Sequence, residues 1–177
     1  MSRPCLRSVR HVSLQLILAA TLGSAVPLQA FADGVSIPRV RDTGNPEIAA
    51  LLREAAERSV TFRLLVRAIE ATDGIVYVEA GTCGHSVRAC VPLMLTVAGP
   101  HRLLRVVVDL RRARDQVLAA IGHELQHAVE VLREPSIKTT AAMYYRFYDE
   151  GRAENGSFET RAALEAGQKI AHELTRR

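Results

Sequence analysis

The chain has 177 residues, of which 48% are hydrophobic and 24% are charged. This composition excludes a disordered or fibrous chain and suits one globular domain. The formal net charge of +4 falls to +1 without residues 1–32, which hold three arginines and no acidic residue. No basic patch interleaved with aromatic residues is present in the sequence, so we expect no nucleic-acid partner.

Residues 1–32 have the pattern of a secretory signal peptide. Their arginines precede an apolar stretch of about 13 residues, and the segment closes on the small-x-small sequence Ala30-Phe31-Ala32. A membrane anchor is the alternative, but a spanning helix needs about 20 apolar residues. We therefore predict that residues 33–177 are a secreted or periplasmic mature domain without a stable membrane span.

The mature chain begins with a polar segment and two predicted helices. Residues 33–44 are expected to be a loose arm. Asn45 then caps a helix that has Pro46 at its first position, where the missing N–H is not needed. A second helix is predicted to begin near residues 59–61 and to end at residues 73–74.

Three segments are predicted to be strands because they are rich in β-branched and large apolar residues. They are residues 75–80, 92–97 and 102–110, the last two forming a hairpin. Between the first two, Cys83 and Cys90 favour a disulfide in an exported chain. The alternative is a metal site that includes His85, although it lacks a fourth ligand at the usual spacing.

The rest of the chain is predicted to be largely helical. Residues 111–132 form a long helix that a following proline ends, and residues 139–151 are a short helical or irregular segment. Ser157 can cap a last helix over residues 158–174. This order predicts an α+β domain, with a small three-stranded, antiparallel or mixed sheet packed against helices.

The long helix contains the sequence HELQH, which has the H-E-x-x-H spacing. His123 and His127 lie about 40° apart around the helix axis, so both imidazoles can bind one metal ion. Their neighbours on this helix are mostly apolar, and buried histidines and acids are costly without partners. We predict that both histidines bind Zn²⁺ and that Glu124 is the general base for a zinc-activated water.

A catalytic zinc usually has a third protein ligand. Glu159 is the preferred candidate, because a helical wheel places it on the inward, alanine-rich face of the last helix. Glu165 falls on the opposite, solvated face of the same helix. Other acidic residues precede this helix and stay open as alternatives: Asp149, Glu150 and Glu154.

The two segments HELQH and FETRAA, 32 residues apart from His127 to Glu159, resemble the gluzincins. These zinc metallopeptidases have H-E-x-x-H on one helix and a glutamate ligand on a later one, often within E-x-x-A-D. In this chain Ala163 replaces the aspartate that commonly orients a zinc histidine, and Glu130 is a candidate substitute. The resemblance implies a minimal zincin-like domain over residues 33–177.

By this resemblance the protein hydrolyses peptide bonds in a peptide or protein substrate, with Glu124 activating water. The strand over residues 102–110 could be the sheet edge that aligns the substrate, or an ordinary core strand. Three tyrosines are candidates for oxyanion stabilisation or for packing: Tyr144, Tyr145 and Tyr148. The alternative function is a non-catalytic zinc-binding or scaffold module, against which the presence of Glu124 argues, since a structural site needs no base.

Overall fold

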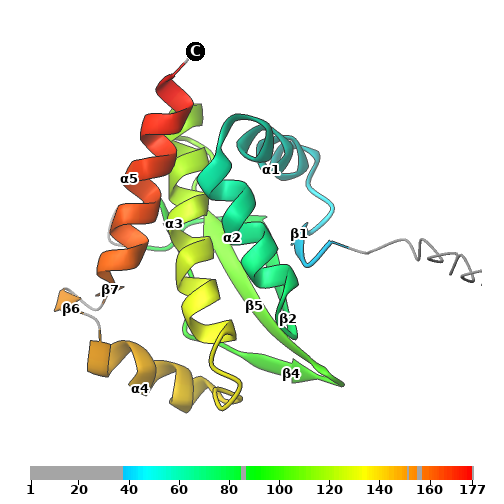
Figure 1. Ribbon diagram of the computed structural model, residues 1–177, viewed down its shortest axis with the longest axis vertical. Coiled ribbons are helices and arrows are strands. Elements are labelled where there is room, and N and C mark those ends of the chain that lie inside the picture. The colour runs from blue at the N-terminus through cyan, green and yellow to red at the C-terminus, as the bar shows by residue number, and fades with distance from the viewer. Residues whose placement is uncertain (1–37, 85–86, 151, 155–156, 177) are drawn as a thin grey trace, which may run out of the picture. The chain divides into compact units, whose positions relative to one another are not determined.

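The computed structural model describes residues 38–84, 87–150, 152–154 and 157–176. The predicted signal peptide therefore lies outside the described residues. Within them the chain forms five helices and a small mixed sheet, consistent with the predicted α+β class (Figure 1). Among the same residues, no helix is both long enough and apolar enough to cross a membrane.

The main sheet has five strands rather than the three predicted. They are β1 (Val40–Asp42), β2 (Gly74–Ala80), β3 (Ala89–Cys90), β4 (Thr96–Ala98) and β5 (His101–Val108). The order is β1-β2-β5-β3, with β4 also paired to β5. β1 and β5 run parallel to β2, whereas β3 and β4 run antiparallel to β5. The predicted hairpin is present, but β5 lies inside the sheet and is not its edge.

Residues 40–42 were expected to belong to a loose arm, and this prediction is wrong. These residues form β1, which pairs with Val76, Tyr77 and Val78 of β2. The polar composition of the segment hides this pairing because the partner strand lies more than thirty residues further along the chain. Val40 is buried in the core, which explains why the segment is held on the sheet.

The helices pack on the sheet and on one another. They are α1 (Pro46–Arg58), α2 (Val60–Glu70), α3 (Arg114–Leu132), α4 (Thr140–Glu150) and α5 (Arg161–Thr175). Figure 1 shows α3 between α2 and α5, in front of β5. Asn45 caps α1 as predicted, its side chain accepting hydrogen bonds from the backbone N–H groups of Glu47 and Ile48. Ser59 caps α2 in the same way through Phe62.

The C-terminal end of α3 is fixed by a buried arginine. Arg102 at the start of β5 is 2% exposed, and its guanidinium binds the carboxylate of Asp73 at 2.6 Å. It also donates hydrogen bonds to the backbone carbonyl oxygens at and beyond the end of the helix, those of Val131, Leu132, Glu134 and Ile137. The carbonyls of Val131 and Glu134 also accept hydrogen bonds from the backbone N–H groups of Glu134 and Ile137. Arg102 adds a side-chain donor from across the fold to the last turn of α3 and to the turn beyond it.

The prediction that Ser157 caps the last helix is wrong. Residues Ser157–Glu159 form a short strand, β7, paired antiparallel with β6 (Arg152–Glu154). Helix α5 begins at Arg161, and its cap is Thr160, whose hydroxyl accepts a hydrogen bond from the backbone N–H of Ala163 at 3.1 Å. Glu159 consequently precedes the helix, and the helical wheel that included it does not apply.

The predicted disulfide is confirmed. Cys83 and Cys90 are joined, with their Cα atoms 5.9 Å apart. The bridge ties β3 to the segment that follows β2, and β3 pairs with β5 through Ala89 and Cys90. The short edge strand is therefore held both by the sheet and by a covalent link.

Candidate metal centre

Helix α3 places the two histidines of HELQH on one side, facing a single region. The ring centroids of His123 and His127 are 4.9 Å apart and the planes are nearly perpendicular, at 75°. His127 is 5% exposed and Glu124 is 7% exposed, while His123 is partly accessible. The spacing of four residues thus brings two imidazoles together at a largely buried position, as the sequence predicted.

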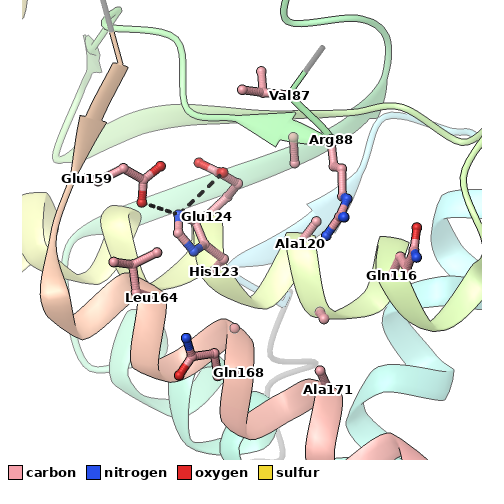
Figure 2. A pocket seen from close by; sticks show the side chains of 13 residues that line it. Val87, Arg88, Gln116, Ala120, His123, Glu124, Glu159, Leu164, Gln168 and Ala171 are labelled. Atoms are coloured by element: carbon pink, nitrogen blue, oxygen red, sulfur yellow. Dashed lines mark ion pairs between the residues drawn. The ribbon is translucent and has the colours of Figure 1, made fainter. Parts of the chain in front are cut away.

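Glu159, from the end of β7, completes a group of three side chains that could hold a metal ion. Ligand atoms of His123, His127 and Glu159 all lie within 4.8 Å of one another. The Oε2 atom of Glu159 lies 3.2 Å from Nε2 of His123 (Figure 2). A tetrahedral ion with bonds near 2.0–2.1 Å separates its ligand atoms by about 3.3 Å, so small side-chain movements would close the group around an ion.

The hydrogen bonding of the same Glu159 oxygen also points to a bound ion. Oε2 is buried and accepts no hydrogen bond from the described residues, despite its closeness to the His123 ring. A buried carboxylate oxygen without a donor is costly, and most such atoms in proteins are satisfied by protein, water or an ion. The three side chains therefore fit a bound cation.

The other acidic candidates do not join this group. Glu165 lies on the exposed face of α5, where it forms an ion pair with Arg161 at 2.6 Å. The remaining alternatives have side chains outside the described part of the chain: Asp149, Glu150 and Glu154. Glu159 was thus selected by an incorrect argument about a helix face, and the structure brings it to the histidines from a strand.

Two glycines let α5 approach α3 closely beside the histidines. A Cβ atom added to Gly122 of α3 would lie 2.1 Å from Cδ1 of Ile170, far closer than two carbon atoms can approach. A Cβ atom added to Gly167 of α5 would lie 3.2 Å from Cβ of His123. The close contact positions the beginning of α5, and with it Glu159, against the metal-binding face of α3. Neither glycine stands out in the sequence, because their close contacts depend on the packing of two distant helices.

Glu130 orients His127, as the sequence suggested. Nδ1 of His127 donates to Oε2 of Glu130 at 3.1 Å, which leaves Nε2 free for a metal. The other oxygen of Glu130 accepts hydrogen bonds from the hydroxyl of Thr160, at 2.8 Å, and from the amide of Gln126, at 3.3 Å. Burial by itself would raise the pKa of Glu130, but the hydrogen bonds from His127 and Thr160 outweigh it and lower the pKa.

Thr160 was not singled out by the sequence analysis. It caps α5, hydrogen-bonds to Glu130 and directly follows Glu159 in the chain. One hydroxyl therefore connects the start of α5 with the group that orients His127. A signal was available, because a threonine directly before an alanine-rich helical segment is a typical cap.

Glu124 lies beside the three candidate ligands without joining them. Its Oε1 atom lies 3.9 Å from Nε2 of His123, and it is not one of the clustered ligand groups. Burial raises the pKa of Glu124, and this effect exceeds the opposing influence of His123 and His127. A carboxyl group with a raised pKa is suited to exchanging protons near neutral pH.

The charges of the candidate ligands are coupled in the metal-free protein. Burial favours neutral His123, but contact with Glu159 and the charge of Glu124 raise the pKa of its imidazole above the ordinary value. The same contact lowers the pKa of Glu159, against the effect of burial. A cation entering this group must displace the proton from His123, because only the neutral ring can bind a metal.

Two cavities open on either side of Glu124 and Glu159. One, of about 500 Å³, lies between α3, α5 and the residues around β3, and Figure 2 shows His123 and both glutamates at one end of it. The other, of about 320 Å³, is lined by the disulfide, His127, Phe147 and Phe158, in addition to the two glutamates. The candidate metal centre therefore lies where two hollows of the surface meet.

None of the three tyrosines considered for oxyanion stabilisation lines either cavity. All three are exposed. The ring of Tyr144 packs against those of Tyr145, Tyr148 and Phe158. The aromatic residue of α4 that reaches the site is Phe147, whose ring centroid is 5.4 Å from that of His127. In this structure the contacts of these tyrosines are with one another and with Phe158.

Comparison of the chain with models of known protein families, with curated proteins and with solved structures gives no match. The residues of this chain and their arrangement are therefore the basis for inferring its function.

Proposed function

We propose that the protein is an exported zinc metallopeptidase of gluzincin type. The observation that carries this proposal is the buried Oε2 atom of Glu159, which forms no hydrogen bond of standard geometry with the described residues and lies 3.2 Å from Nε2 of His123, in one group with His127. Two neutral imidazoles and one carboxylate, with space for a fourth ligand, are the donor set typical of catalytic zinc. The disulfide between Cys83 and Cys90 agrees with export to an oxidising compartment.

In this proposal His123, His127 and Glu159 hold the ion, and Glu130 keeps Nε2 of His127 turned toward it. Zinc in such a site supplies a Lewis acid for the substrate carbonyl and lowers the pKa of a water molecule. Glu124 accepts the proton of that water and later gives it to the nitrogen of the departing amine. Its burial supports this role, because a raised pKa makes the protonated carboxyl a competent acid for the second step.

The surroundings of the site support a peptide substrate. Cleavage within a chain requires room on both sides of the reacting carbonyl, and the two cavities flank Glu124 in that manner. Strand β3, at the end of the sheet order, pairs with β5 and presents its other side beside α3. An extended peptide could align there by adding to the sheet.

A non-catalytic zinc-binding or scaffold module is the second candidate. Both functions require the same three ligands, so the observation that separates them is Glu124. A structural zinc site closes its coordination with protein ligands and needs no buried carboxyl group beside an accessible cavity. Glu124 lines both cavities without joining the ligand group, which favours the enzyme.

The test measures zinc content and peptide hydrolysis of the purified protein beside two isosteric variants. We expect about one zinc per chain, weakened by Glu159→Gln and retained by Glu124→Gln, with hydrolysis of a peptide library lost in both. Zinc with unimpaired hydrolysis in Glu124→Gln would exclude Glu124 as the base. If the unaltered protein binds zinc but hydrolyses no peptide, the scaffold module is favoured. If Glu159→Gln binds zinc as tightly as the unaltered protein, the proposed ligand set is refuted.

A further inference from the structure

The larger cavity is lined by different kinds of side chain at its two ends. At one end lie His123, Glu124 and Glu159. Its floor is formed by small residues of the two packed helices, namely Ala119 and Ala120 of α3 and Gly167 and Ala171 of α5. The absence of bulky side chains here leaves room for part of a substrate rather than for water alone, since a volume near 500 Å³ is in the range of ligand pockets.

The rim of this cavity carries exposed apolar side chains near the candidate metal centre. Leu164 of α5 is 46% exposed and Val87 is 36% exposed, although both are large aliphatic residues. Figure 2 shows Leu164 below Glu159 and Val87 above it, on either side of the opening. Such a pair can contact the aliphatic part of a bound chain.

The far end of the cavity is cationic and rich in hydrogen-bond donors. Arg88 extends toward α3 there, near Ala120 and Gln116, as Figure 2 shows. Its backbone carbonyl accepts a hydrogen bond from the N–H of Asp109 at 2.8 Å, which fixes the start of the side chain against the end of β5. Among the described residues no ion pair involves the Arg88 guanidinium, and the acidic residues lining the cavity are Glu124 and Glu159 at its opposite end.

We propose that this cavity binds the part of the substrate that carries a carboxylate and that Arg88 recognises that group. The inference rests on the proposed peptidase function and specifies its substrate class. The guanidinium matches a carboxylate in charge and in planar geometry, and the amide of Gln116 is a further donor. The carboxylate belongs either to a glutamate side chain near the cleaved bond or to the C-terminal α-carboxyl group of a short peptide.

The experiment compares synthetic peptides that differ in one group. One pair has glutamate or glutamine at each position within three residues of the cleaved bond, and the other ends in a free carboxylate or an amide. The zinc-loaded protein should cleave the carboxylate member of one pair with a kcat/KM at least about tenfold higher. This preference should vanish in Arg88→Gln and persist in Arg53→Gln, a control that removes an exposed arginine of α1 outside both cavities.

The pair that shows the preference identifies the source of the carboxylate. Equal cleavage of both members in both pairs, or a preference that survives Arg88→Gln, would overturn the inference while leaving the peptidase intact. Binding of the same peptides to zinc-loaded Glu124→Gln, measured by fluorescence anisotropy, separates the two proposals. Binding that depends on Arg88 without hydrolysis by the unaltered protein would support carboxylate recognition and refute the peptidase. Binding without any preference for the carboxylate would refute recognition itself.

Discussion

Two polar clusters lie along α3, one around Arg102 at its C-terminal end and one around His123 near its middle. In the first, every guanidinium nitrogen donates to the carboxylate of Asp73 or to a backbone carbonyl. In the second, the buried Oε2 atom of Glu159 forms no hydrogen bond of standard geometry with the described residues. The comparison indicates how a stabilising cluster differs from a binding site: the former is closed by the protein's own groups, whereas the latter leaves an atom for a ligand.

The largest expected effect is on catalysis at the cluster around His123, which we call the open cluster; the cluster around Arg102 is the closed cluster. Glu124→Gln should lower kcat for peptide hydrolysis by about 10³-fold, because an amide cannot accept the proton of water. The free energy of unfolding should not fall, since burial already disfavours the charged form of Glu124 and the amide is neutral. Parallel measurement of hydrolysis and of urea unfolding checks both expectations; a variant that unfolds more easily would place Glu124 among the stabilising groups.

The closed cluster should show the opposite behaviour. Arg102→Met should lower the free energy of unfolding by about 3 kcal/mol, because it removes the ion-pair partner of Asp73 and the side-chain donor of the backbone carbonyls at and beyond the end of α3. Arg105→Met on the same strand is the control, since Arg105 is half exposed in an ion pair with Glu79 and should change stability by less than about 1 kcal/mol. Urea unfolding measures the free energy of unfolding of both variants. A similar loss in the two variants would contradict a special role for Arg102.

A substitution at Glu130 tests whether its hydrogen bond to His127 contributes to zinc affinity in the open cluster. Glu130→Gln weakens the hydrogen bond to Nδ1 of His127 and should reduce zinc affinity by about 10- to 100-fold. Glu165→Gln is the matched control on the exposed face of α5. Competition with a chromophoric chelator measures both affinities, and an unchanged value in Glu130→Gln would mean that packing alone orients the ring.

The smallest effect is the pH dependence of stability conferred by the metal. The pKa of His123 is raised above its ordinary value of 6.5 in the metal-free fold. Protonated His123 thus stabilises that fold below pH 6.5, and this contribution is lost as pH rises through the raised pKa. Zinc requires the neutral ring, and displacing its proton costs about 1.4 kcal/mol more for each pH unit below the raised pKa. The rise in Tm on adding zinc should therefore be larger at pH 8 than at pH 6. Thermal unfolding with and without zinc measures it; equal rises would mean that His123 binds no metal.

Local patterns in the sequence were sufficient for much of the fold. The cap at Asn45, the strand before the cysteines and the helix carrying HELQH depend on residues within a few positions of one another, and each is present. The disulfide was likewise predicted from the compartment and the pairing of two nearby cysteines. Short-range rules apply to these features because the interactions that determine them are short-range.

Features that depend on distant partners were missed or reached by a wrong argument. Val40 joins a strand only because β2 offers an edge for pairing, and Arg102 looked like an ordinary residue of a hairpin although it is almost completely buried. Glu159 was selected on a helical wheel, but the chain extends at that point and Thr160 starts the helix. Its proximity to His123 arises from the packing of α5 on α3, which no local periodicity encodes.

The hydroxyl of Thr160 connects the candidate metal centre to the first turn of α5 through two hydrogen bonds. It accepts from the first turn of α5 and donates to Glu130, next to the candidate ligand Glu159. Fraying of that turn would release Glu130 and Glu159 together, so local opening of α5 and loss of the ion would be one event. Amide hydrogen exchange in the first turn of α5 would consequently slow when the ion binds, reporting occupancy from a position outside the ligand shell.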